Sequence, residues 1–174
     1  MRAVLLSGYV AWPAPPRDGV ARGTGVPRGA RYRAAIVALT YRFCWAIDDR
    51  DWTGLRALFT PDASGFLGVD CPTVDAMVEQ CRGFLGALDA SHHLVTNHLV
   101  AIDGDDASCR AYFQAQHTIR GATGGDNWLL GGRYIDQLRR TEAGWRIAFR
   151  DLVVVWTEGN AAVLATASEF RGAP

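Results

Sequence analysis

The sequence predicts a single α+β domain in which a curved antiparallel sheet wraps around helices. Between residues 32 and 88, apolar residues recur at three- and four-residue steps, which is typical of amphipathic helices. From residue 90 onward, polar and apolar residues alternate, which is typical of strands. With 174 residues, the chain is long enough for one well-buried core and short for two domains.

Three helices and a short strand are expected in the first half. The first helix runs from residue 32 to residues 48–49, with an apolar stripe of Ile36, Leu39, Phe43 and Ile47. A second, short helix carries Trp52, Leu55, Leu58 and Phe59, and the turn-forming sequence TPDA at residues 60–63 ends it. Residues 64–69 form a short strand, and Pro72-Thr73 start a third helix with Met77, Cys81, Phe84 and Leu88 on its apolar side.

Strands fill the second half. Residues 107–119 alternate cleanly, and their apolar face carries Ala107, Cys109, Ala111, Phe113, Ala115 and His117. Residues 127–140 and 145–157 form a hairpin around TEAG, with one face made of Trp128, Leu130, Tyr134, Leu138, Trp145, Ile147 and Phe149. His117 is therefore expected to point inward.

The stretch DASHHLVTNHLV, residues 89–100, holds three of the four histidines and reads as a strand leading into a hairpin. Alternation places His93 on one face with Val95, Asn97 and Leu99. His92 and His98 lie on the other face, six residues or about 20 Å apart, too far for ligands of one ion. No metal site is predicted, and His98, like Asp49, is assigned to the surface or an interface.

The same hairpin brings two histidines together. If it turns near residues 104–105, position 93 lies opposite 116 or 117, which places His93 near His117. A register shifted by one residue would instead pair His92 with His117 and turn His93 outward. The sequence leaves both registers open.

Composition excludes several classes of function. The net charge is zero and the pI is near 6.9, so electrostatic capture of nucleic acid or an anionic membrane is not expected. All 18 basic residues are arginine, which excludes a lysine Schiff base. The four cysteines show no C-x-x-C spacing and are expected as buried thiols in a reducing compartment, the cytoplasm.

The termini differ in composition from the centre. Residues 1–30 are expected to form a Pro/Gly/Arg-rich arm, residues 31–160 the folded domain and residues 161–174 a tail. AVLLSGYVAW, residues 3–12, would also fit a short signal peptide, although Ser7-Gly8 interrupt its apolar run. No segment reaches transmembrane length.

Three segments taken together resemble the SnoaL-like members of the nuclear-transport-factor-2-like superfamily. They are YRFCWAIDDRDWTGLRALFTPDA, HHLVTNHLVAIDGDDA and GGRYIDQLRRTEAGWRI, and the likeness spans roughly residues 32–157. The resemblance implies a cone-shaped α+β barrel with a deep apolar pocket, in dimers or trimers. The chain looks most like the branch of scytalone dehydratase, bile-acid dehydratase and hexachlorocyclohexane dehydrochlorinase.

That branch implies a set of site residues. An aspartate after the first helix falls on Asp48, a pocket histidine on His93, a second histidine on His117, and an arginine after the GW tryptophan on Arg150. The chain departs from the scytalone enzyme at Ile47, where that enzyme has a tyrosine. It also departs at Tyr134, where that enzyme has an asparagine.

Imidazole chemistry supports these assignments independently. A carboxylate bonded to one nitrogen of an imidazole fixes its tautomer and stabilises the imidazolium, so Asp48 and His93 could act as a general base without a cofactor. His117 or Tyr134 could then protonate a leaving hydroxyl or hold a carbonyl oxygen. The remaining predicted substrate-binding residues are Trp45, Asn97, Phe113, Trp128 and Arg150. Strict alternation turns Arg150 away from the pocket unless a bulge intervenes, and Asp151 competes with it.

Two functions follow from this. The first is a cofactor-independent lyase or isomerase, a dehydratase or cyclase acting on a hydroxylated aromatic or polycyclic carbonyl compound of natural-product metabolism, such as a polyketide. The second is a non-catalytic binding or assembly subunit of the same fold, in which Asp48 merely ends a helix and the two histidines are satisfied core residues. An epoxide hydrolase of the limonene type would need a second pocket carboxylate, which only Asp151 could supply.

Overall fold

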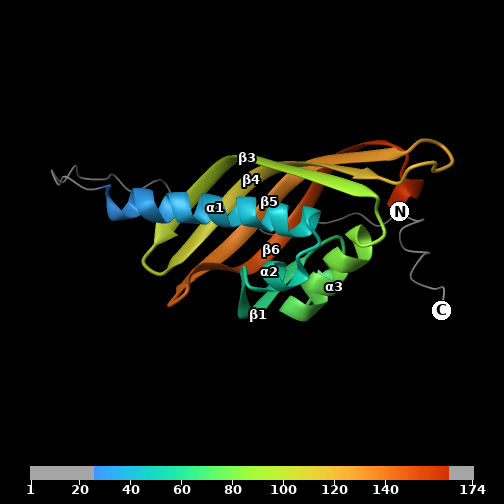
Figure 1. Ribbon diagram of the computed structural model, residues 1–174. Coiled ribbons are helices and arrows are strands. Elements are labelled where there is room, and N and C mark those ends of the chain that lie inside the picture. Colours follow the sequence, from blue (N-terminus) through green and yellow to red (C-terminus); the bar gives the residue numbers. More distant parts are fainter. Residues whose placement is uncertain (1–25, 165–174) are drawn as a thin grey trace, which may run out of the picture.

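The computed structural model describes residues 26–164, which form one six-stranded sheet and three helices (Figure 1). The elements are α1 (Arg28–Asp48), α2 (Trp52–Arg56), β1 (Phe59–Phe66), β2 (Asp70–Cys71), α3 (Val74–Leu85), β3 (Ala90–Asp103), β4 (Asp106–Thr118), β5 (Asn127–Thr141) and β6 (Gly144–Gly159). The strand order is β2-β1-β6-β5-β4-β3, and all pairs are antiparallel except β1 with β6. The predicted α+β class is confirmed.

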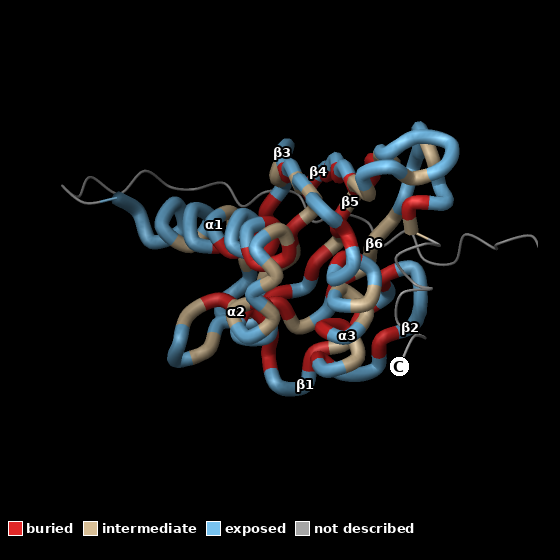
Figure 2. Tube along the Cα trace, turned by 45° about the vertical axis from the view of Figure 1, so that its right-hand side comes forward, coloured by how far each residue is buried: buried red, intermediate tan, exposed pale blue. Residues whose placement is uncertain are grey.

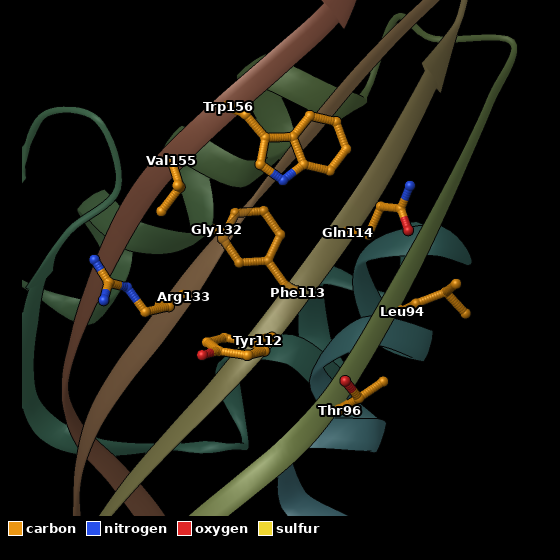
Figure 3. Close-up of a pocket in the computed structure, with 9 residues that line it drawn as sticks. All are labelled: Leu94, Thr96, Tyr112, Phe113, Gln114, Gly132, Arg133, Val155 and Trp156. Atoms are coloured by element: carbon orange, nitrogen blue, oxygen red, sulfur yellow. The ribbon is translucent and has the colours of Figure 1, made fainter.

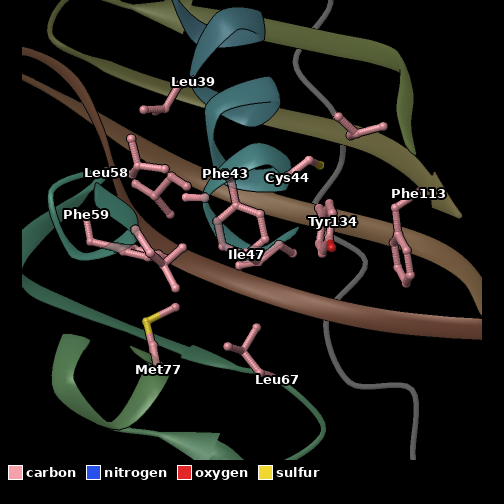
Figure 4. Close-up of a cluster of buried hydrophobic side chains, with 14 of the residues drawn as sticks. Leu39, Phe43, Cys44, Ile47, Leu58, Phe59, Leu67, Met77, Phe113 and Tyr134 are labelled. Atoms are coloured by element: carbon pink, nitrogen blue, oxygen red, sulfur yellow. The ribbon is translucent and has the colours of Figure 1, made fainter. Parts of the chain in front are cut away.

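The helices lie on one side of the sheet, where α1 packs along β3 and α3 lies beside β1 (Figure 1). The predicted stripe of α1 is buried, as are the residues that face it from the sheet, and the buried stretches gather where helices and sheet meet (Figure 2). Figure 4 shows the centre of this core, in which Phe43 and Tyr134 lie edge to face. Apolar burial of this kind is the main force holding the layers together.

The expectation of a turn at residues 60–63 is wrong, because these residues belong to β1. The strand is irregular there, since its register with β6 shifts between Phe59 and Ser64 and both Pro61 and Asp62 are exposed. A proline has no N–H to donate, so a bulged, outward-facing position tolerates it within a strand. The second helix is correspondingly short and ends at Arg56.

A bulge divides β3 into two halves of opposite phase. Thr96 pairs with Tyr112 and Leu99 with Arg110, so two residues of β3 oppose one of β4. Asn97 has a φ of 55°, in the left-handed region that asparagine tolerates better than most residues. Before the bulge the odd-numbered residues face inward, and after it the even-numbered ones do, beginning with His98.

A second bulge, at Ala148, changes the inward face of β6. Leu138 pairs with Ile147 and Gln137 with Phe149, which leaves Ala148 unpaired. Phe149 is consequently 39% exposed rather than buried as predicted, whereas Arg150 is fully buried. Arg150 rather than Asp151 therefore points into the molecule.

The ends of the domain differ slightly from the expectation. α1 begins at Arg28, within the predicted arm, and Val163, within the predicted tail, is fully buried. Residues 1–25, including the segment compared with a signal peptide, and residues 165–174 lie outside the described part. None of the helices within residues 26–164 is long and apolar enough to cross a bilayer.

Candidate active site

An internal cavity of about 290 Å³ lies between α1, α3, the 67–69 loop and the inner face of the sheet. Its walls are mostly apolar, and its polar side chains are Gln80, Cys81, His93, His117 and Tyr134. Burial raises the pKa of Cys81 to about 12, so this thiol stays protonated at neutral pH. A small apolar chamber with a few convergent polar groups is typical of a small-molecule site.

Asp48 and His93 form the predicted pair beside this cavity. The C-terminal end of α1 lies against the first half of β3, and Nδ1 of His93 is 2.6 Å from Oδ1 of Asp48. The backbone N–H of His93 donates to Oδ2 at 2.8 Å, and the hydroxyl of Ser91 donates to Oδ1 at 2.7 Å. Both carboxylate oxygens of Asp48 are thus occupied by donors that fix its orientation.

These bonds determine the protonation states of the pair. Burial disfavours the carboxylate charge, but hydrogen bonds from His93 and Ser91, together with the His93 charge, outweigh burial and lower the pKa of Asp48. An ionised carboxylate only accepts, so Nδ1 carries a hydrogen and, in the neutral ring, the lone pair lies on Nε2. With a side chain only 6% exposed and lining the cavity, His93 can present that lone pair to a ligand.

His117 lies next to His93 in the cavity, with ring centroids 5.5 Å apart and the planes nearly perpendicular. In the β3–β4 ladder His93 pairs with Ala115 and Ser91 with His117, so the predicted pairing partner of His93, residue 116 or 117, is wrong. The bulge at Asn97 causes the difference, yet it also puts both rings on the inner face. The open choice between His92 and His93 is settled, because His92 is exposed.

The environment of His117 keeps its ring neutral. Burial, together with the His93 charge, lowers the pKa of His117 to about 4. Its Nδ1 has no hydrogen-bond partner among residues 26–164. A neutral imidazole cannot act as a strong acid at pH 7, but it can bond a polar atom of a ligand.

Three other predicted residues line the cavity. Phe113 and Tyr134 stack with centroids 4.6 Å apart, and Trp128 lies against His117 at 5.6 Å. Full burial, the largest influence, raises the pKa of Tyr134 well above its usual value, so its hydroxyl remains a donor at all moderate pH values. These rings shape a flat, apolar space.

Arg150 is not part of the cavity wall. Its guanidinium makes a bidentate pair with Asp136, at 2.7 and 2.6 Å, and both side chains are buried. It sits in the corner between two rings, 3.9 Å from the Phe43 centroid and 4.2 Å from that of Tyr134. Arg150 therefore supports the ring of Tyr134 from behind, and the predicted contact with substrate is wrong.

Two more predicted contacts fall outside the cavity. Trp45 is 69% exposed and lines a groove between α1 and β3, because its position lies off the buried stripe of α1. Asn97 is exposed at the bulge. His98, expected at the surface, instead turns inward and places Nε2 2.7 Å from the Thr40 hydroxyl.

The outer face of the sheet carries a separate groove of about 440 Å³ (Figure 3). Tyr112, Val155 and Trp156 are exposed there, and Arg133 is the cation on its wall. Phe113 borders this groove as well as the inner cavity. Neither Asp48 nor His93 or His117 lines this groove, whereas both histidines line the inner cavity.

Sequence reasoning missed several residues of the site. Arg50 and Ser91 contact Asp48 or its partner, while Gln80 and the 67–69 loop close the cavity. The position of Ser91 two residues before His93 on one strand was an available signal, since both side chains share a face. Within residues 26–164, no three His, Cys, Asp or Glu side chains are placed to hold a metal ion.

Several solved structures are similar to this chain in fold. The Kfla4162 protein from Kribbella flavida is 28% identical, with a TM-score of 0.72 over 79% of this chain and 99% of that chain. A candidate scytalone dehydratase from Novosphingobium aromaticivorans is 19% identical, with a TM-score of 0.67 over 74% and 87%. A hexachlorocyclohexane dehydrochlorinase, LinA type 2, is 16% identical, with a TM-score of 0.66 over 74% and 88%.

The last two likenesses concern the fold alone, and no curated protein matches the sequence. The family model of the SnoaL-like domain matches residues 28–151, which include Asp48, His93 and His117. The chain therefore belongs to the SnoaL-like domain family.

Proposed function

We propose that this protein is a cofactor-independent lyase or isomerase, a dehydratase or cyclase that uses His93 as its general base. The observation that carries the proposal is the Asp48–His93 hydrogen bond of 2.6 Å at the wall of an apolar cavity. A base positioned in this way contributes about 10²- to 10⁴-fold to proton transfer. The family hosts several activities, so the site and not the fold decides the function.

The proposed elimination needs one proton carrier. Nε2 of His93 takes a proton from an acidic C–H, and the charge of Asp48 stabilises the imidazolium. The carbon–oxygen bond of a neighbouring hydroxyl breaks, and the imidazolium returns its proton to the leaving oxygen, which gives a double bond and water. In an isomerisation, the same proton returns to another carbon.

Tyr134 is proposed to donate to the substrate carbonyl oxygen, and Nδ1 of His117 to accept a hydrogen bond from a substrate hydroxyl, because the His117 ring is already hydrogen-bonded to the backbone of Trp128. Both groups are neutral at pH 7 and line the same cavity as His93. Donors placed where negative charge develops stabilise an enolate more than the starting ketone. The sequence predicted that His117 could protonate the leaving hydroxyl. Because its pKa of about 4 leaves no imidazolium at pH 7, we assign it a hydrogen-bonding role instead.

The cavity also indicates the substrate class. Its walls are apolar and aromatic, and its polar side chains other than the proposed base His93 are uncharged at pH 7. Arg150, the nearest buried cation, is already neutralised by Asp136. A neutral hydroxylated aromatic or polycyclic ketone fits such walls, whereas burial of an unpaired anion would be costly.

The test measures dehydration of a panel of aryl β-hydroxyketones by the ultraviolet absorbance of the enone product. His93→Gln should lower the rate by about 10²-fold or more, while the same substitution at the exposed neighbour, His92→Gln, should leave it unchanged. Equal rates in the two variants would refute the role of His93. Ligand binding without turnover by the native protein would favour the non-catalytic alternative.

Assembly into a dimer or trimer and a cytoplasmic location stay predictions from the sequence. Light scattering coupled to size-exclusion chromatography measures the first.

A further inference from the structure

A directed chain of hydrogen bonds reaches the same oxygen of Asp48 that His93 Nδ1 contacts. Nη1 of Arg50 lies 2.8 Å from Oγ of Ser91, and Oγ of Ser91 lies 2.7 Å from Oδ1 of Asp48. A guanidinium can only donate and a carboxylate can only accept. The Ser91 hydroxyl must therefore accept from Arg50 and donate to Asp48, so its hydrogen has one position.

The backbone of Arg50 is held in an unusual conformation. Its φ is 60°, and within residues 26–164 only Asn97 shares a positive φ among non-glycine residues. The left-handed region is unfavourable for a residue with a Cβ, so the surrounding contacts must hold Arg50 there. Nη1 also donates to the carbonyl oxygens of Ile47 and Asp48, at 2.7 and 3.0 Å, which ties the guanidinium to the end of α1.

From this geometry we infer that Arg50 and Ser91 are positioning residues that lock the Asp48 carboxylate and thereby fix the tautomer of His93. The inference rests on the proposed function, since it explains how Nε2 stays free for the substrate. Ser91 and Nδ1 of His93 share Oδ1, while the His93 backbone takes Oδ2. Without Ser91 only the two His93 donors hold the carboxylate, so its rotation about the Cβ–Cγ bond is less restricted and the bond to Nδ1 is weaker.

Other groups near the pair do not supply this lock. The titratable side chains that face His93 are Cys44 and Asp48 from α1, Arg50 from the following turn, Cys81 from α3, His117 from β4 and Tyr134 from β5. Neither thiol is a hydrogen-bond donor to Asp48, and burial raises the pKa of both to about 12. Ser91 and the two His93 groups are the donors that Asp48 meets within residues 26–164.

The test reads the tautomer directly and needs no substrate. Ring ¹⁵N shifts of ¹⁵N-histidine-labelled protein at about pH 8.5, where free imidazole is neutral, distinguish the Nδ1–H from the Nε2–H form. We expect the Nδ1–H form in the native protein. In Ser91→Ala and Arg50→Asn the ratio of Nε2–H to Nδ1–H should rise about tenfold, because bonds to charged groups contribute at least that factor.

Two control variants and one internal reference make the result decisive. Ser91→Thr keeps the hydroxyl and should restore the native ratio, whereas Arg42→Asn removes an exposed arginine of α1 and should change nothing. His92, exposed on the same strand, serves as the internal reference. Ser91→Ala removes only the side-chain oxygen and leaves the strand backbone intact. The tautomer ratio can therefore be measured in this variant even if Arg50→Asn does not fold.

A native ratio in both Ser91→Ala and Arg50→Asn would overturn the inference and leave Arg50 as a helix cap. Failure of the dehydration assay alone would refute the proposed function and not the lock.

Discussion

Burial of His117 makes the stability of the protein depend on pH in a defined window. In the unfolded chain a histidine binds a proton near pH 6.5, but in the folded protein His117 does so only near pH 4. Between pH 6.5 and pH 4 this histidine binds a proton in the unfolded chain but not in the folded protein. The free energy of unfolding therefore decreases as the pH falls through this range. At about 1.4 kcal/mol per pH unit, this difference amounts to about 3 kcal/mol.

His117→Gln should remove this loss. Urea unfolding of both proteins at intervals from pH 7 to pH 4 gives the free energy of unfolding for each, and the native protein should lose about 3 kcal/mol more than the variant. Asp48 does not disturb the comparison, because its lowered pKa confines its own loss to lower pH, and it is present in both proteins. Parallel curves would show that His117 titrates normally and would refute the burial argument.

Two further substitutions test the packing beneath the site by urea unfolding. Arg150→Met should lower the free energy of unfolding by about 3–5 kcal/mol, because it leaves the buried carboxylate of Asp136 without its partner. Adding Asp136→Leu should recover most of this loss. Failure of the second change to help would show that the pair contributes through packing rather than charge. Gly132→Ala should cost more than about 2 kcal/mol, because a Cβ there would lie 2.0 Å from the carbonyl oxygen of Val153. Gly29→Ala, where the added Cβ meets nothing within 4 Å, is the matched control and should be neutral or stabilising.

The sequence predicted the layers of the fold well because its patterns are long. The stripe of α1 and the alternation of residues 107–119 each span several repeats, and burial of one face requires that period. The turn expected at residues 60–63 failed for the opposite reason. The composition of residues 60–63 fits an irregular strand as well as a turn. Only the pairing of this segment with β6 decides between a turn and a strand.

The sequence predicted the site correctly wherever it predicted which face of a helix or strand each residue occupies. Asp48, His93 and His117 lie together as expected, since one follows a strongly periodic helix and another sits on a clean strand. Phe149 and Asn97 were misplaced because each follows or forms a bulge, which adds one residue to a strand and reverses the faces beyond it. A bulge depends on long-range pairing, so a period alone cannot locate it.

The extra residue in β3 has a consequence for how this site could arise or be lost. If β3 paired without the bulge, with Asn97 taken into the regular ladder, the half of the strand that leads into the hairpin would impose its own phase on the half that precedes it. His92 would then replace His93 as the ring turned toward the helices. The two neighbouring histidines mean that an imidazole would enter the cavity in either frame. Deletion of Asn97 would instead remove the extra residue and leave His93 facing inward, so which ring turns inward depends on whether the bulge forms.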